Sequence, residues 1–362
     1  MGLLVKTLSL QSYRNFRERE VSFSPATTIL VGRNAVGKTN TVEALQMLTA
    51  GHSFRHPTPA EQVLEGAEQA RIGARLEGDG RVIDVACEIS PGRRRFTKNG
   101  KKCVAADLSE TLMSVLFCPD DLSLVKGGAA NRRGELDDFG CEANRGYSKL
   151  LSAYLRAVEQ RNRLLRDEYP DPSLLAAWDA SVAVGGATLL QARCRLYRRL
   201  SEKIEQIYEN IGGGEKLTCS YKSTVADDPL SLSRDDLADV FLARLEAARD
   251  IDLRRQQTTI GPHRDDAIFA IEGRDARAFG SQGQQRSIVL ALKMAEVLVS
   301  AEVTGSRPLL LLDDVMSELD EGRRQSVIEF AQRGIQTVIT TTNLGYFTKE
   351  LLDSSLVVSF SE

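Results

Sequence analysis

The chain has 362 residues, 42% of them hydrophobic and 27% charged, with a formal net charge of −3. This balance excludes a disordered chain, and the length corresponds to about two domains. No apolar run is long enough for us to expect a membrane span, and the start of the chain turns polar too soon for a signal peptide. Six dispersed cysteines without a C-x-x-C pair lack the spacing of a zinc site, so we expect reduced thiols in a cytoplasmic protein.

The first 104 residues are predicted to be rich in β-structure. Apolar patterns predict strands over 3–10, 20–23 and 27–31, and a glycine-bounded loop separates the last of these from a helix over 39–48. Two hairpins are expected next, because the turn sequences EGDG and Asn99-Gly100 each separate short β-prone segments.

The middle of the chain has a different character. Residues 147–166 and 174–210 carry apolar side chains at three- and four-residue intervals, which predicts two long helices, with a break or kink at Gly185-Gly186. After the glycine run at 212–214 we expect a helix over 281–298 and strands over 216–223, 267–271, 309–312, 336–341 and 356–360.

Strands alternate with helices at both ends of the chain, which predicts an α/β fold with a mainly parallel sheet covered on both faces. The simplest arrangement is one α/β domain built from residues 1–125 and 255–362. A helical lobe over residues 126–254 is then inserted between its two halves.

A phosphate-binding motif directly follows the strand over 27–31. Residues 32–39, GRNAVGKT, match G-x-x-x-x-G-K-[ST] between a predicted strand and a predicted helix. The glycines let backbone N–H groups surround a phosphate, and the helix N-terminus adds partial positive charge. We expect Lys38 to reach the β- and γ-phosphates and the Thr39 hydroxyl to bind Mg²⁺. The expected nucleotide-binding residues are Gly32, Arg33, Asn34, Ala35, Val36, Gly37, Lys38, Thr39 and Asn40.

Two carboxylates, Asp313 and Asp314, follow a strand of four leucines. They lie at the strand's C-terminal edge, where open α/β sheets bind ligands. We expect one of these carboxylates to hold Mg²⁺, directly or through water, and the next to polarise the attacking water as a general base. Asp313 lies 275 residues after Lys38, which is unlike a compact P-loop kinase or GTPase and implies a large insertion.

Residues 281–286, SQGQQR, lie at the start of the predicted helix over 281–298. A serine and a glycine at a helix N-terminus form an anion-binding end, although an ordinary N-cap explains the same serine.

Together the three motifs resemble the RecF family of bacterial recombinational-repair ATPases, of the ABC/SMC class. The resemblance extends from Leu3 almost to the end of the chain, and it includes residues 12–16, 53–55, 117–122, 132–133, 160–162, 261–266 and 309–320.

The resemblance implies a P-loop ABC-type ATPase head with an antiparallel β subdomain and an inserted helical lobe. It implies that Ser281, Gly283 and Gln284 belong to a signature motif that addresses the γ-phosphate of ATP bound to a second copy. Asp313 is then the Walker B magnesium residue, and Asp314 occupies the position of the catalytic carboxylate.

Further roles are implied by the same resemblance. Residues 317–320 resemble a D-loop, and Asp120 or Asp121 falls where a Q-loop connects the lobes. The switch residue is expected within 340–343, and Thr341 is our candidate. The expected catalytic set is therefore Lys38, Ser281, Asp314 and Thr341.

Two positions depart from the family pattern. Ala35 stands where the family usually has glycine. If the backbone at this position needs a positive φ, alanine adds about 1 kcal/mol of strain, and we then expect weaker nucleotide binding than in typical members. Residues 127–130 lack the usual proline, which affects the connection between the lobes.

The resemblance implies a weak, DNA-stimulated ATPase whose ATP-dependent homodimer clamps double-stranded DNA or single/double-strand junctions. It also implies RecO and RecR as partners and RecA loading as the outcome. Candidate basic patches are Arg93–Arg95 with Lys98, Lys101 and Lys102, and Arg193, Arg195, Arg198 and Arg199, although solvated surface explains any single cluster somewhat better. Two alternatives remain, an SMC-like chromosome-structuring ATPase and a P-loop phosphotransferase. The central segment is short for SMC arms, and we identify no acid–base pair for a small-molecule acceptor.

Several polar residues near the P-loop have two interpretations. Arg14 and Asn15 either line the nucleotide base or form a surface turn. His52, Ser53 and Arg55 are candidates for sensing phosphate or DNA. His263, in a Gly-Pro-His turn, is a candidate structural residue.

Overall fold

The computed structural model describes residues 2–361 and contains two compact units. The first comprises Met1–Leu122 and Val289–Glu362, and the second comprises Ser123–Ile288. The sequence-based boundary at 255 differs from this division, because residues 255–288 belong to the second unit. The physical reason is strand pairing, since β10 (Asp266–Ile271) pairs with β9 (Leu217–Lys222).

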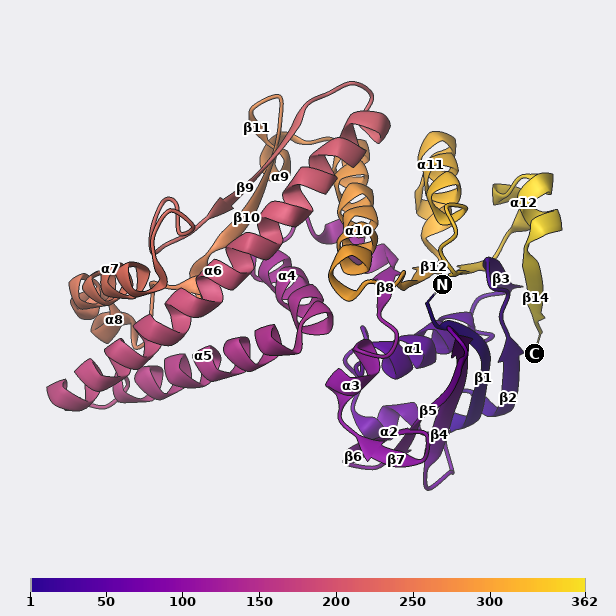
Figure 1. Cartoon of the computed structure of the whole chain (residues 1–362), viewed down its shortest axis with the longest axis horizontal. Helices are drawn as coiled ribbons and strands as arrows, with labels where there is room; N and C mark the ends of the chain where they lie inside the picture. Colours follow the sequence, from indigo (N-terminus) through magenta and orange to yellow (C-terminus); the bar gives the residue numbers. More distant parts are fainter. Residues whose placement is uncertain (1, 362) are drawn as a thin grey trace. The chain divides into compact units, whose positions relative to one another are not determined.

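The first unit is built on a parallel sheet of five strands in the order β14-β3-β13-β12-β8, drawn in Figure 1. Its strands are β3 (Thr27–Gly32), β8 (Ser114–Phe117), β12 (Leu309–Asp313), β13 (Thr337–Thr341) and β14 (Leu356–Phe360). All residues of the central strands β12 and β13 are buried, as expected of strands covered on both faces, and so are those of β8 at the edge of the sheet. The strands' C-terminal ends therefore bring the P-loop and Asp313 to one edge.

A second sheet in the same unit is antiparallel, with six strands in the order β2-β1-β4-β5-β6-β7. Its strands are β1 (Leu4–Tyr13), β2 (Phe16–Ser22), β4 (Ala70–Gly78), β5 (Arg81–Ser90), β6 (Arg93–Lys98) and β7 (Lys101–Cys103). Helix α1 (Lys38–Thr49) contacts strands of both sheets, and ten of its twelve residues are buried. The helix that begins at the P-loop is thus fixed by packing on two sides.

The remaining elements of the first unit are short. They are α2 (Pro59–Gln62), α3 (Ala105–Ser109), α11 (Glu321–Ala331), α12 (Lys349–Ser354), η1 (Pro119–Ser123), η3 (Val315–Glu318) and η4 (Leu344–Tyr346). Helix η1 ends, and α10 (Gln282–Thr304) begins, in the second unit.

The second unit combines helices with a three-stranded antiparallel sheet in the order β11-β10-β9 (Figure 1). Its other elements are α4 (Ala129–Ala143), α5 (Arg145–Leu164), α6 (Pro172–Ile211), α7 (Arg234–Ala247), α8 (Arg249–Arg255), η2 (Pro262–Arg264), β11 (Arg274–Asp275) and α9 (Ala276–Phe279). Helix α6 continues through Gly185-Gly186, so the predicted break does not occur. Gly186 instead permits close packing, because a Cβ there would lie 2.4 Å from Phe241 Cε1.

Helix α6 corrects one expectation from the sequence. Within residues 2–361 it is long and apolar enough, by length and composition, to cross a membrane. Its apolar window is also 44% buried, and Val182, Ala187 and Leu190 lie in the core of the second unit. A core helix passes the same test, so this helix is weak evidence for a membrane span.

Candidate functional site

The loop after β3 has the backbone that the P-loop motif requires. Gly37, the N-cap of α1, has φ 104°, and a Cβ there would lie 2.2 Å from Phe16 Cζ. At Gly32 a Cβ would lie 2.5 Å from the Phe360 carbonyl oxygen. Both positions therefore exclude a side chain, and the loop's conformation depends on its two glycines.

Ala35 has φ 67°, in the left-handed region, so this position does need a positive φ. A non-glycine residue in this region carries a cost of about 1–2 kcal/mol. The strain falls in the middle of the segment that is expected to surround phosphate.

We expect Ala35→Gly to raise the free energy of unfolding by up to about 1 kcal/mol and to tighten ATP binding by up to about fivefold. Thermal denaturation and titration with a fluorescent ATP analogue measure the two effects. Ala176→Gly on the exposed side of α6 is the matched control, and it should destabilise by about 1 kcal/mol. A destabilised Ala35→Gly variant would show that the loop is not strained.

The Asp313 carboxylate receives two hydroxyl hydrogen bonds. Thr39 Oγ1 donates to Asp313 Oδ1 at 3.0 Å, and Thr340 Oγ1 donates to the same oxygen at 2.8 Å. Burial raises the pKa of Asp313, while these hydrogen bonds act in the opposite direction. A hydroxyl and a carboxylate are oxygen ligands of the type that Mg²⁺ takes, so Thr39 and Asp313 fit the predicted metal-binding role.

Asp314 and Lys38 lie near Asp313, and their opposite charges influence each other's pKa. Burial raises the pKa of Asp314, and the positive charge of Lys38 partly opposes that rise. Burial also lowers the pKa of Lys38. The Lys38 ammonium donates to the carbonyl oxygens of Gly32 and Arg33, each at 2.7 Å, which orients it toward the loop. A raised pKa makes the Asp314 carboxylate a stronger base for a proton from water.

Lys38, Thr39 and Asp314 line one pocket of about 230 Å³ in the first unit. The pocket is lined by Asn34, Ala35, Gly37, Lys38, Thr39, Asn40, Arg55 and Asp314. Eight of the nine predicted nucleotide-binding positions of residues 32–40 thus line the pocket or accept a hydrogen bond from its lysine, namely 32–35 and 37–40. Val36 is buried in the core of the unit.

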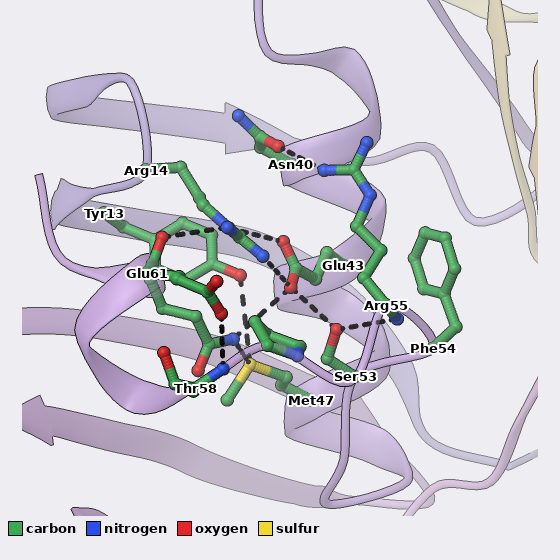
Figure 2. Close-up of polar contacts among 12 residues, drawn as sticks. Tyr13, Arg14, Asn40, Glu43, Met47, Ser53, Phe54, Arg55, Thr58 and Glu61 are labelled. Carbon is green, nitrogen blue, oxygen red and sulfur yellow. Dashed lines mark hydrogen bonds and ion pairs between the residues drawn. The ribbon is translucent and has the colours of Figure 1, made fainter. Parts of the chain in front are cut away.

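Figure 2 shows a hydrogen-bonded network beside this pocket, centred on Glu43 of α1. Glu43 is fully buried and accepts hydrogen bonds from the Arg14 guanidinium at 2.6 and 2.9 Å and from Ser53 Oγ at 2.7 Å. Arg55 donates its backbone N–H to Ser53 Oγ and its guanidinium to Asn40 Oδ1. Arg14 is thereby committed to an ion pair, whereas Arg55 reaches the pocket. Sequence reasoning missed Glu43, because a carboxylate among apolar helix residues carries no motif.

The two threonines at the end of β13 have different partners. Thr340 Oγ1 contacts Asp313 and also accepts the Asp314 backbone N–H at 2.9 Å. Thr341 Oγ1 donates to the Asn343 carbonyl oxygen and so stabilises the following turn. Successive strand residues face opposite sides of a sheet, so Thr340, not the chosen Thr341, lies beside the carboxylates.

The predicted signature segment lies in the second unit at the start of α10. Ser281 is exposed, and its hydroxyl accepts the Gln284 backbone N–H at 3.2 Å. The Gln284 side-chain oxygen accepts the Ser281 backbone N–H at 2.7 Å, which completes a reciprocal cap. This cap holds Ser281 at a positively polarised helix end.

The sequence 261–266, GPHRDD, organises the interior of the second unit. His263 Nδ1 lies 2.7 Å from Tyr154 Oη, and Asp265 Oδ1 accepts hydrogen bonds from Thr224 at 2.7 and 2.9 Å. Arg193 is 1% exposed and donates to Asp137 and to the Pro262 carbonyl oxygen. Arg193 is therefore a core residue, which corrects its prediction as part of a basic surface.

Other predicted basic residues are exposed. On the β6–β7 hairpin these are Arg93, Arg95, Lys101 and Lys102, and on α6 they are Arg195, Arg198 and Arg199. Lys98 donates to Thr111, and Arg94 donates to Gln62 and to the Pro57 carbonyl oxygen. The hairpin thus presents four cations to solvent.

The family model of the RecF/RecN/SMC N terminal domain matches residues 4–361. The chain is 38% identical to the DNA replication and repair protein RecF of Heliobacterium modesticaldum, over 96% of this chain and 95% of that protein. It is 37% identical to the protein of the same name from Rippkaea orientalis, over 98% and 97% of the two chains. The similarity therefore covers both units.

Solved structures show the same likeness. The structure of the recombination mediator protein RecF with ATP in the RecFOR pathway has a TM-score of 0.88 and 28% identity, covering 96% of this chain and 94% of that chain. An Smc head bound to the C-winged helix domain of ScpA has a TM-score of 0.57 and 14% identity, which shows a shared fold. The predicted α/β, P-loop ATPase fold class is confirmed.

Proposed function

This chain belongs to the RecF family of DNA replication and repair proteins, and we propose that it is an ATP-driven DNA clamp of recombinational repair and replication restart. ATP joins two copies around DNA, and slow hydrolysis, stimulated by DNA, separates them. RecO and RecR are its proposed partners in loading RecA. The proposed location is the cytoplasm.

The observation that carries this proposal is the convergence of Lys38, Thr39, Asp313 and Asp314 at one edge of the parallel sheet. ATP placed with its phosphates along the P-loop meets the loop's N–H groups and the Lys38 ammonium. Thr39 and Asp313 are the proposed ligands of Mg²⁺, which neutralises phosphate charge when bound. Asp314 accepts a proton from the attacking water as its oxygen bonds to the γ-phosphorus, and the bond from the γ-phosphorus to the bridging oxygen breaks, which gives ADP and inorganic phosphate.

Dimerisation is proposed from the signature segment. Ser281 is exposed and capped at a helix N-terminus, an arrangement suited to a phosphate supplied by another molecule. If each copy offers Ser281 to its partner's ATP, the interface is two-fold and isologous, and it contains two nucleotides. ATP then acts as part of the interface, and its hydrolysis weakens that interface.

DNA binding is proposed to use phosphate contacts. The exposed cations of the β6–β7 hairpin and of α6 suit a duplex backbone without base readout. An SMC-like chromosome-structuring role is disfavoured, because the segment between the motifs forms a compact unit with its own sheet. Stimulation of hydrolysis by a small-molecule acceptor, and not by DNA, would favour the phosphotransferase alternative.

The test is the protein molar mass by light scattering of Asp314→Asn, which slows hydrolysis, measured without nucleotide, with Mg-ADP, with Mg-ATP, and with Mg-ATP and DNA. We expect the mass to double with Mg-ATP alone or with Mg-ATP and DNA. Ser281→Arg in the same background should remain monomeric, because a bulky cation blocks the helix end. A monomer that binds ATP tightly under every condition would overturn the clamp proposal.

A further inference from the structure

Glu215 directly follows the glycine run 212–214 after α6 and lies two residues before the start of β9. Both of its carboxylate oxygens accept hydrogen bonds from the Gln284 amide nitrogen, at 2.7 and 2.9 Å. The two residues are 69 positions apart in the chain, and both belong to the second unit. A charged acceptor thus fixes one end of the Gln284 side chain.

The other end of the same amide controls the backbone at Ser281. Gln284 Oε1 accepts the Ser281 N–H at 2.7 Å, while Ser281 Oγ accepts the Gln284 N–H at 3.2 Å. An amide whose nitrogen is held by a carboxylate cannot exchange its oxygen and nitrogen without losing three hydrogen bonds. Glu215 therefore determines which way the Gln284 amide faces, and the amide determines the conformation of Ser281.

The local backbone brings Glu215 to this place. Gly213 and Gly214 have φ 74° and 89°, so the chain reverses after α6 through a turn that favours glycine. Ser287 Oγ of α10 lies 3.5 Å from the Ile211 carbonyl oxygen, which keeps the end of α6 against the start of α10. Tyr208 Oη donates to Glu215 at 3.4 Å from the last turn of α6.

We infer that Glu215 is a positioning residue for the signature segment, acting through Gln284 to hold the Ser281 hydroxyl and the α10 N-terminus in the geometry that receives a partner copy's ATP phosphate. This inference deepens the proposed function and rests on it. Because the serine is already ordered in the single copy, less conformational entropy is lost when two copies associate, and the ATP-joined dimer is more stable. Binding of ATP to the chain's own P-loop does not involve Glu215.

The test measures dimer dissociation constants in Mg-ATP, with Asp314→Asn as the common background. Glu215→Ala should weaken the dimer roughly ten- to hundredfold, while its affinity for ATP as a monomer stays unchanged. Glu209→Ala, which removes an exposed carboxylate from the last turns of α6, is the matched control and should dimerise as the background does. The fluorescence of Trp178 in the second unit reports whether the variants fold alike.

A swap of the two side chains separates positioning from simple packing. Gln284→Glu places two carboxylates together and should weaken dimerisation as strongly as Glu215→Ala does. Glu215→Gln combined with Gln284→Glu restores a donor facing an acceptor and should recover most of the dimer. Equal dissociation constants for Glu215→Ala and the background, or failure of the swap to rescue, would overturn the inference. A background protein that never dimerises would instead overturn the proposed clamp itself.

Discussion

Asp314→Asn is expected to lower the rate of ATP hydrolysis by about 10²–10⁴-fold while leaving ATP affinity within a few-fold of the original. The asparagine keeps the size of the side chain but cannot accept a proton from water. Asp314 also has φ 53°, a conformation that asparagine tolerates, so the substitution leaves the backbone unstrained. Phosphate release in steady state and titration with a fluorescent ATP analogue give the two numbers.

Asp353→Asn is the matched control, since it removes an exposed carboxylate from α12 of the same unit. It should hydrolyse ATP at the rate of the unmodified chain. Hydrolysis by Asp314→Asn at that same rate would show that a different group accepts the proton. Slow hydrolysis accompanied by lost ATP binding would assign Asp314 to nucleotide binding.

The nucleotide site was predictable because its signals are local. The strand over 27–31, the glycine loop and the helix that follows are adjacent in sequence, and the structure forms them as β3, the P-loop and α1. The leucine strand 309–312 also appears as predicted, within β12. The strain at Ala35 was also predictable, because an alanine in place of the usual glycine is strained if φ is positive, and the structure shows a positive φ.

Other parts depended on partners far away in the chain. Strand β8, with the sequence SVLF, is too short to show periodicity, and it is defined by its parallel pairing with β12 nearly 200 residues later. Arg193 resembles its neighbours Arg195 and Arg198 in type, but it faces inward on α6. Its partner Asp137 is 56 residues away, so no local pattern distinguished a core arginine from a surface one.

The largest loss of stability that we expect from one substitution is at a buried ion cluster whose members are far apart in the chain. Arg161 of α5 is 0% exposed, and it donates to Asp179 Oδ1 at 2.5 Å and to Asp252 Oδ2 at 2.6 Å. These contacts join α5 to α6 and α8, and Thr258 accepts a further hydrogen bond at 2.9 Å. Removing the arginine leaves two carboxylates buried with reduced compensation.

Arg161→Met is therefore expected to destabilise the second unit by about 3–5 kcal/mol, a large part of a typical domain's stability. Trp178 is the one tryptophan of the chain and precedes Asp179, so its fluorescence during urea denaturation follows this unit. Arg163→Met removes a 62% exposed arginine of the same helix and should cost less than about 1 kcal/mol. Because the loss arises from uncompensated charge, adding Asp179→Asn and Asp252→Asn to Arg161→Met should recover part of it. Equal urea midpoints for the two arginine variants would show that the second unit does not depend on this buried ion cluster.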